Sequence, residues 1–409
     1  MAEDSTAAKI VGLLIGRDPE VTRVILSDGS SRDMPGGKWP DLDSSLDLVL
    51  VAFEPAMIVF RSRETDWIYP ELPRPNNLAP VLERPLVYLD QNHWSTLSKA
   101  TYDRDRVPAR EMAAADKVIA LAKAGRIILP MSSGHLSETG AWGDDESRYR
   151  LGLTILQLSR GWQLRDPHSV RRQEFVRDLR SVANLEIGSL PEVITLEPWA
   201  IQERLDANSS SFALEGVFSG ADTLFLFEIL LAGNVYASMF LNTDSLPRDP
   251  PGGWTAAQQK FTDWLAGENA RSAREKRASA EVFALNDIAK ELAEAAVEAG
   301  VTPALVSDWM LDKWWNNKIE TMPATMIFRN LLVDKHLEPA TRWEDNDLTD
   351  LWFLAAAAGY SDYVVGEKRT TGLLRQVKQR LSLPVTVVRS LADLVDILPA
   401  EVFAEPSEE

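Results

Sequence analysis

The sequence predicts an α/β fold with a central parallel sheet, interrupted by a long helical insertion and preceded by a small β-rich module. Strands and helices alternate over residues 84–184 and again over residues 341–400, an order that favours parallel strands. Residues 185–340 between these parts have a mostly helical pattern, and residues 1–75 contain the alternating apolar runs of β-strands. An acidic tail occupies residues 401–409.

The β-rich module contains three strand-like runs. They are KIVGLLIG (9–16), VTRVILSDGSSRDM (21–34) and LDLVLVAFEPAMIVFRS (46–62). Asp28 and Gly29 form a dipeptide that is typical of β-hairpin turns. The proline-rich stretch 69–80 is expected to link this module to the first α/β part.

The two α/β parts each contain strands that alternate with helices. In the first, the expected elements are a strand ending at Leu89, a helix over 107–125 and the strand RIILP (126–130). In the second, they are the helix NDLTDLWFLAAAAG (346–359), the strand DYVVG (362–366), the helix RTTGLLRQVKQRLS (369–382), the strand VTVVRS (385–390) and the helix LADLVDIL (391–398).

Composition indicates a soluble, cytoplasmic protein without a membrane span. The most apolar stretch, 224–241, is interrupted by Glu228 and Asn234, so we expect a buried helix there. The N-terminus lacks the basic and apolar regions of a secretory signal. The chain has 0 cysteines, which fits a reducing compartment and leaves oxygen and histidine as the only metal ligands.

The formal net charge of −18 repels nucleic acid unless basic residues gather locally or a cation screens the site. It therefore argues against a non-specific nucleic-acid coat. It remains compatible with a metal-dependent enzyme acting on a phosphodiester, since active-site carboxylates themselves add negative charge.

Several carboxylates are expected to meet at one edge of the parallel sheet. Asp90 ends the strand at 87–89, and Glu367 ends the strand at 362–366, so parallel strands place both at the same rim. Glu138 lies in the early turns of a helix that follows the strand at 126–130, which also begins at that rim.

Asp347 and Asp350 lie three residues apart near the start of the helix 346–359 and therefore share one face of it. If the chain enters this helix from the carboxyl end of a strand, both acids join the others above the sheet. Carboxylates that converge raise one another's pKa, so a fold that keeps them needs a compensating cation. Hard oxygen ligands favour Mg²⁺ or Mn²⁺, which activate water and neutralise a reacting phosphate.

Each of these acids also has a purely structural explanation. Asp90 and Asp347 could be helix caps, Asp350 a first-turn acid favoured by the helix dipole, Glu138 a surface residue, and Glu367 an ion-pair partner of Lys368 or Arg369. One shared site is the more economical explanation, provided that the predicted strand directions are correct.

The acidic segments resemble those of the PIN-domain (PIN-like) metal-dependent ribonucleases. The resemblance rests on VYLDQNHW, ILPMSSGHLSET, NDLTDLWFLAAAAGYSDYVVGEK and the closing SLPVTVVRSLADLVDIL. Asp90 and Glu138 match the first-strand and helix acids of the family, and Asp350 matches its third, with Asp347 as an addition or substitute. Glu367 stands where the family more often has aspartate. The resemblance covers about residues 84–183 and 341–400.

The resemblance implies an α/β/α sandwich and Mg²⁺- or Mn²⁺-dependent endonucleolytic cleavage of RNA by water. Asp90, Glu138, Asp350 and Glu367 would be catalytic, and Asp347 would join them as metal ligands. Such domains in bacteria often act as toxins or in defence against phage, so an antitoxin or regulatory protein is an expected partner. The regions outside the resemblance would recognise a substrate, a partner or another copy of the chain. DNA stays open as an alternative substrate.

Six further residues near the acids are candidates for substrate binding: Asn92, His93, Ser133, His135, Lys368 and Arg369. Histidine titrates near neutral pH and could orient water or contact phosphate. Hydrogen bonds within the scaffold, helix capping and a solvated helix face are the alternative explanations.

Two other classes of function stay open at this point. One is a non-nuclease metal-dependent phosphohydrolase, and the other is a catalytically inactive PIN-like binding protein. The chain has no phosphate-binding P-loop, dinucleotide-binding glycine motif, HExxH zinc motif or serine-hydrolase elbow, which argues against those enzyme classes.

Overall fold

The computed structural model describes residues 9–17, 20–34, 44–53, 56–72, 84–140, 144–188, 192–202, 221–241, 253–315, 321–338 and 340–404. These residues form a mixed α/β structure with a 6-stranded antiparallel sheet and a 3-stranded parallel sheet. Most of the predicted linker, residues 73–80, and the end of the acidic tail, residues 405–409, lie outside the described residues.

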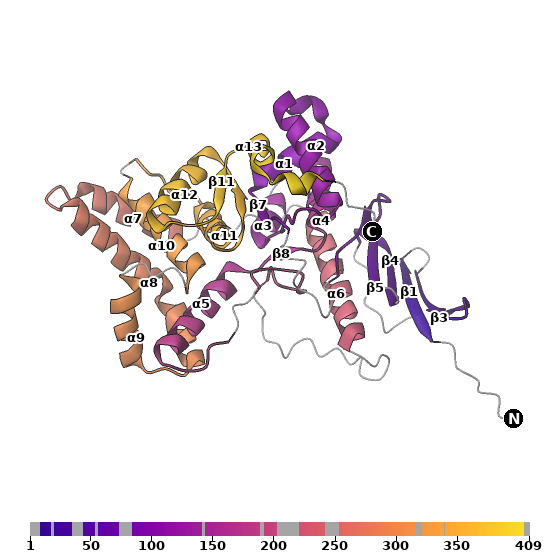
Figure 1. Ribbon diagram of the computed structural model, residues 1–409, viewed down its shortest axis with the longest axis horizontal. Helices are drawn as coiled ribbons and strands as arrows, with labels where there is room; N and C mark the ends of the chain where they lie inside the picture. Colours follow the sequence, from indigo (N-terminus) through magenta and orange to yellow (C-terminus); the bar gives the residue numbers. More distant parts are fainter. Residues whose placement is uncertain are drawn as a thin grey trace.

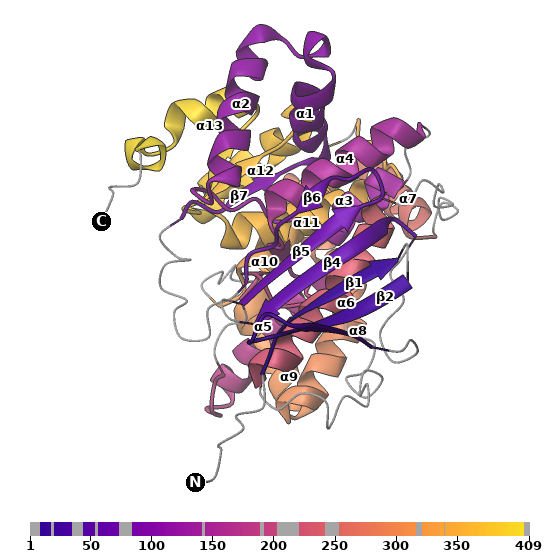
Figure 2. The same cartoon turned by 90° about the vertical axis from the view of Figure 1, so that its right-hand side faces the viewer.

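The antiparallel sheet is built by the N-terminal region and has the order β3-β2-β1-β4-β5-β6. Its strands are β1 (Ile10–Arg17), β2 (Glu20–Leu26), β3 (Ser31–Met34), β4 (Leu46–Phe53), β5 (Ala56–Ser62) and β6 (Trp67–Ile68). The predicted turn at Asp28 and Gly29 is confirmed: Gly29 has a φ of 79°, and the Leu26 amide donates to the Ser30 carbonyl over 2.9 Å. Figure 2 looks onto the face of this sheet that is turned away from α6 (Ala221–Leu241).

The inner face of the antiparallel sheet packs on α6. Leu13, Val51 and Ile58 lie opposite one another on neighbouring strands and are buried, as the alternating pattern predicts. The helix approaches closely because Gly233 has no side chain: a Cβ there would lie 2.3 Å from Cζ of Phe60.

The parallel sheet joins the two α/β parts of the chain in the order β11-β10-β7. Its strands are β7 (Val87–Leu89), β10 (Tyr363–Val365) and β11 (Thr386–Val388), and Val364 pairs with Tyr88 on one side and Val387 on the other. The predicted parallel sheet is thereby confirmed.

The predicted strand RIILP is wrong as a full strand. Only Ile128 forms a bridge, to Leu86, although its direction is parallel as expected. Pro130 has no amide hydrogen to donate to a sheet, so it cannot extend the pairing as a donor.

Most of the remaining described chain is helical. The helices are α1 (Gln91–Tyr102), α2 (Ala109–Lys123), α3 (Ser133–Gly140), α4 (Asp145–Ser159), α5 (Pro167–Val182), α7 (Gly253–Gly267), α8 (Ala273–Ala299), α9 (Pro303–Trp309), α10 (Pro323–Leu337), α11 (Asp347–Tyr360), α12 (Lys368–Leu381) and α13 (Leu391–Ile397). Short elements complete the chain: η2 (Arg104–Arg106), β8 (Gln163–Leu164), β9 (Ile194–Thr195), η3 (Met310–Trp314) and η4 (Ala400–Phe403). The antiparallel sheet lies at one end of the long axis and α7 to α9 at the other (Figure 1).

Alternate residues of the parallel strands enter two different hydrophobic cores. Leu89 and Val365 belong to the core that also contains residues of α1, α2, α4 and α13. Tyr88 and Val364 point the other way, into the core formed with α5, α8, α10, α11 and α12. Both faces of the parallel sheet are therefore covered by helices.

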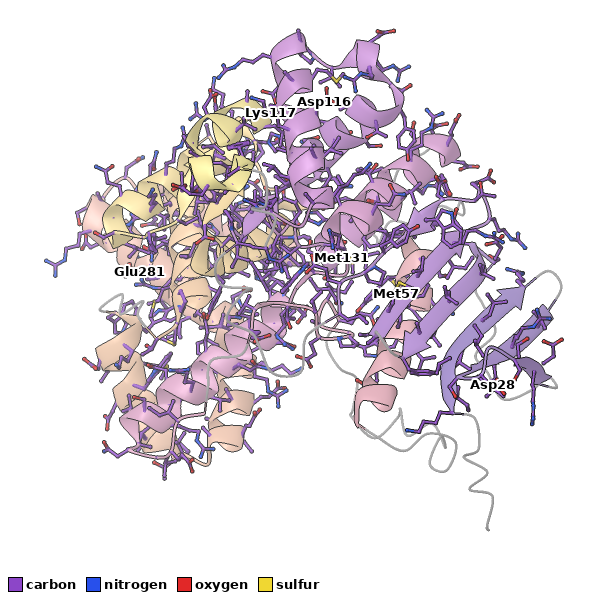
Figure 3. All side chains as sticks on the ribbon, turned by 45° about the vertical axis from the view of Figure 1, so that its right-hand side comes forward. Asp28, Met57, Asp116, Lys117, Met131 and Glu281 are labelled. Atoms are coloured by element: carbon purple, nitrogen blue, oxygen red, sulfur yellow. The ribbon has the colours of Figure 1, made fainter. Side chains whose placement is uncertain are left out.

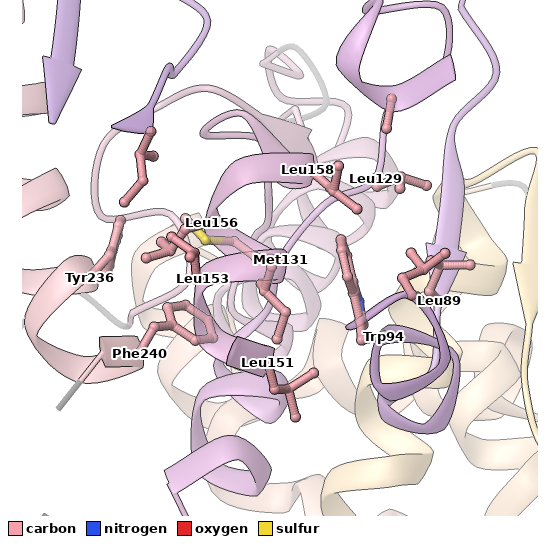
Figure 4. Close-up of a cluster of buried hydrophobic side chains, with 14 of the residues drawn as sticks. Leu89, Trp94, Leu129, Met131, Leu151, Leu153, Leu156, Leu158, Tyr236 and Phe240 are labelled. Carbon is pink, nitrogen blue, oxygen red and sulfur yellow. The ribbon is translucent and has the colours of Figure 1, made fainter. Parts of the chain in front are cut away.

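The two cores cross the domain boundaries predicted from the sequence. Figure 4 shows Trp94 of α1 and Leu151 of α4 in the same buried cluster as Tyr236 and Phe240 of α6. Residues of the antiparallel sheet, such as Phe60, belong to this core as well. The antiparallel sheet and part of the helical insertion thus pack directly on the first α/β part.

The rest of the helical insertion packs on the second core. Figure 3 shows the sheet that carries Met57 on one side of the molecule and Glu281 of α8 on the other. The tryptophans Trp309 and Trp314 of the insertion are buried in this core. Within the described residues, no helix is both long enough and apolar enough to span a membrane.

Candidate active site

Asp90 lies at the carboxyl end of β7, where the sequence predicted it. Its backbone is extended, and its Oδ1 accepts a hydrogen bond of 2.8 Å from the Gln91 amide at the start of α1. Its Oδ2 faces the next strand and accepts from the Glu367 amide at 3.4 Å. Asp90 is therefore a helix cap and a rim residue at once, since its two oxygens serve different neighbours.

Three of the predicted acids line one small cavity beside this rim. Asp90, Glu138 of α3 and Asp350 of α11 surround a volume of about 30 Å³, which is room for one or two waters or a small ion. The other lining residues are Tyr88, Gly134, His135, Thr349, Phe353, Leu354 and Thr370. They include no lysine or arginine, so no basic side chain among the described lining residues offsets the acids.

Helices α3 and α11 meet closely at this cavity. A Cβ at Gly134 would lie 2.8 Å from the Cδ2 atom of Phe353, so glycine is what allows the aromatic ring to pack on α3. This close approach places Glu138 and Asp350 on the same cavity although 212 residues separate them in the sequence numbering (350 − 138).

The expected route of the chain to Asp350 is wrong. Helix α11 follows α10 and a connecting segment, not the carboxyl end of a strand. Asp350 reaches the rim because α11 packs along α10 and against α3.

Two of these acids, Glu138 and Asp350, resist ionisation because they are buried close to other carboxylates. Burial, followed by the charges of Asp350, Asp90 and Glu367, raises the pKa of Glu138 to about 8. Burial and the charge of Asp90 are the main causes that raise the pKa of Asp350 to about 7. At neutral pH the cavity must therefore retain protons or accept a cation.

Glu367 is exposed to solvent and is not among the residues that line this cavity, although its amide contacts Asp90. Burial of its carboxyl group and the charge of Asp90 raise its pKa above the ordinary value. The Asn92 side-chain amide donates to Oε1 of Glu367, which ties the start of α1 to the start of α12. Asn92, which the sequence predicted as a substrate-binding residue, therefore orients the Glu367 carboxylate.

Asp347 has partners of its own. The buried Lys335 amino group donates to Oδ1, and the Glu344 amide donates to Oδ2 over 2.6 Å. Lys335 also lies over the Trp343 ring, with its Nζ 4.7 Å from the ring centroid. Asp347 is not among the residues that line the cavity, but its charge contributes to the raised pKa of Asp350, and the charge of Lys335 opposes that rise.

His135 lines the cavity but is already used by the scaffold. Its Nδ1 accepts a hydrogen bond of 3.1 Å from the Ser132 amide, so the proton is on Nε2, which donates to the Leu89 carbonyl over 2.9 Å. The ring stacks on Tyr88 with centroids 5.4 Å apart, and burial lowers the pKa of His135 to about 4. His135 is therefore a neutral residue that fixes β7 to the start of α3.

The other substrate-binding candidates differ in exposure. His93 is buried, and this burial lowers its pKa below the ordinary value. Ser133 is half-buried at the first position of α3, whereas the hydroxyl of Ser132 accepts from the helix amide. Lys368 and Arg369 are exposed at the start of α12, next to Glu367.

Sequence reasoning missed three contributors to this site. Thr349 and Thr370 add hydroxyl groups to the cavity, and their positions beside Asp350 and in the first turn of α12 are the only sequence signals for them. Lys335, which lies 12 residues before Asp347, gave no signal because its role depends on tertiary contacts.

Across the described residues, no three acidic or histidine side chains already form a closed set of metal ligands. Comparison with protein-family models, curated proteins and solved structures finds no match to the chain. The residues of the site themselves define it as an acidic cavity at the carboxyl edge of a parallel sheet.

Proposed function

We propose that the protein is a Mg²⁺- or Mn²⁺-dependent nuclease that hydrolyses phosphodiester bonds of RNA. The observation that carries this proposal is the shared cavity of Asp90, Glu138 and Asp350, which come from three separate elements and have no lining cation. Strongly raised carboxyl pKa values in a cleft are typical of functional sites, because such repulsion is costly for structure alone.

The residues of the cavity fit a hard divalent cation. Asp90, Glu138 and Asp350 offer only oxygen, and a cation between them offsets the burial and the mutual repulsion that raise the pKa values of Glu138 and Asp350. Mg²⁺ commonly keeps several waters and uses few carboxylates, so a complete protein ligand set is not required. When bound, such an ion polarises a phosphate oxygen and lowers the pKa of a water.

The protein's own residues would divide the remaining work. Asp90 and Asp350 would hold the ion, Glu138 in its ionised form would accept a proton from the attacking water, and the leaving oxygen would take a proton from Glu138 or from solvent. Glu367, oriented by the Asn92 amide, would approach the ion from the side of Asp90.

The arrangement of the parallel sheet supports a PIN-like α/β/α sandwich. Strand residues alternate between two helix-covered cores, and Asp90 and Glu367 follow neighbouring parallel strands. The sequence resemblance extends this reading to a toxin or phage-defence effector controlled by a partner protein.

The test is cleavage of end-labelled single-stranded and structured RNA by purified protein in Mn²⁺, Mg²⁺ or EDTA. Wild type should cut only with a divalent ion, and Asp90→Asn and Glu138→Gln should each lower the rate by about a hundredfold or more. Asp116→Asn is the matched control, because Asp116 is exposed on α2 and pairs with Arg104.

Three results would contradict the proposal in different ways. Cleavage that persists in EDTA or in both variants removes the metal site from the mechanism. Hydrolysis of small phosphoesters without cleavage of RNA indicates a phosphohydrolase. RNA that is bound and stays intact indicates a binding protein.

A further inference from the structure

A second hollow lies beside the acidic cavity, between α10 and α12. It has a volume of about 520 Å³, within the range of small-molecule binding sites. Its lining residues are Asp334, Leu337 and Glu338 from α10 and its end, and Arg369, Gly372, Leu373, Gln376 and Arg380 from α12. We refer to these eight residues as the α10–α12 groove.

The groove begins next to the acidic cavity. Thr370 lines the cavity, and its neighbour Arg369 lines the groove, so the first turn of α12 borders both. The two hollows therefore lie on either side of the same helical turn.

Gly372 keeps the floor of the groove open. It lies inside α12, where glycine is less favourable than alanine. A Cβ at this position would meet no atom within 4 Å, so close packing does not account for the glycine. The space above it is part of the groove, which is what a side chain would fill.

The groove offers basic and apolar groups to a ligand. The charge of Asp334 is already matched by Arg277 and Arg380, and its Oδ1 lies 3.1 Å from a guanidinium nitrogen of Arg277. Arg369 has a long contact of 3.9 Å to Glu344, with half of its side chain exposed. It is therefore available to pair with a phosphate.

The apolar part of the groove comes from Leu337 and Leu373, which are half-buried. Apolar side chains of this kind can pack against an unpaired base. The remaining acid, Glu338, has no ion pair among the described residues, and its carboxylate can accept a hydrogen bond from a ribose hydroxyl.

We infer that the α10–α12 groove holds the nucleotide next to the cleaved phosphodiester of a single-stranded RNA. Arg369 contacts the backbone phosphate, and the base lies against Leu337 and Leu373. This inference rests on the proposed nuclease function. It also gives the helical insertion a role, because α10 supplies one wall of the groove.

A size series at Gly372 tests the groove. Gly372→Ala, Gly372→Leu and Gly372→Phe should lower kcat/KM for a short single-stranded RNA progressively, by about tenfold or more for Phe. Binding of Mn²⁺, measured by calorimetry without RNA, should stay at the wild-type value in all three. Circular dichroism and thermal melting confirm that each variant is folded.

Two further variants sharpen the result. Gln379→Phe places the same ring seven residues further along α12, about two turns away and outside the groove lining, and should retain wild-type cleavage. Arg369→Gln should raise KM without filling the groove, which keeps the test valid if Gly372→Phe does not fold.

The outcomes separate the two proposals. Wild-type cleavage that Gly372→Phe and Arg369→Gln leave unchanged overturns the groove and preserves the nuclease. An equal loss in Gln379→Phe and Gly372→Phe also overturns it, because the effect is then not specific to the groove. No cleavage by wild type overturns both.

Discussion

Changing Glu138 to Gln should remove a pH-dependent loss of stability from the metal-free protein. The ordinary carboxyl pKa of 4.5 applies to the unfolded chain, whereas burial and neighbouring acids raise the pKa of Glu138 to about 8 in the folded protein. Between these two values the folded protein binds more protons than the unfolded chain, so the free energy of unfolding falls as pH rises. Above about pH 8 the effect of this carboxyl is constant.

The expected size follows from the same two pKa values. The slope for one carboxyl is about 1.4 kcal/mol per pH unit, which amounts to about 2 kcal/mol between pH 6 and pH 8. Glu138→Gln carries no titrating group at this position. The difference in free energy of unfolding between this variant and wild type should therefore grow by about 2 kcal/mol, in favour of the variant, from pH 6 to pH 8.

The assay is urea unfolding in EDTA at half-unit steps from pH 5 to pH 9, for wild type and Glu138→Gln. Glu64→Gln is the matched control, since Glu64 is exposed and should leave the wild-type pH dependence unchanged. Parallel stability curves for wild type and Glu138→Gln would refute the reasoning, because Glu138 would then ionise as freely in the folded protein as in the unfolded chain.

Three further predictions concern the scaffold of the site. Lys335→Met should destabilise the protein by about 3–5 kcal/mol in chemical denaturation, because it leaves the buried Asp347 carboxylate without its ion-pair partner. Adding Asp347→Asn should recover most of this loss. If stability does not recover, Lys335 acts by packing alone. His135 should stay neutral in NMR titrations until the pH approaches about 4, and a midpoint near 6.5 would contradict the burial that lowers its pKa. Alanine should have opposite effects on the free energy of unfolding at two helical glycines. Gly152→Ala should lower it by about 1–3 kcal/mol, because the new Cβ would lie 2.1 Å from the Phe240 carbonyl oxygen. Gly372→Ala should raise it by roughly 0.5–1 kcal/mol, as measured by thermal unfolding. Equal effects would contradict the packing difference.

Local patterns were enough to predict the parallel sheet and most helices around it. Short apolar runs followed by Asp90 and Glu367 marked two neighbouring strands, because a buried strand and the acidic residue after it are both visible in the sequence. The strand around Ile128 was overestimated, since an apolar run does not reveal how many of its amides find a partner.

The candidate site was only partly predictable for the same reason. Asp90 and Glu138 could be assigned from the elements that precede them, whereas the position of Asp350 depends on the packing of α11 on α10. The pairing of Asp347 with Lys335 is a tertiary contact between two elements, which residue spacing does not encode. The α10–α12 groove was missed because it lies between helices from opposite sides of a predicted domain boundary.

The pairing of β7 with β10 has a consequence for how the protein is made. The amide of Glu367 contacts Asp90 across the entire insertion, and Asp350 belongs to the same late part of the chain. On a ribosome, Asp90 and Glu138 emerge long before these partners exist. A growing chain therefore has no complete acidic cavity until α11 and β10 have been translated and have packed against the first α/β part.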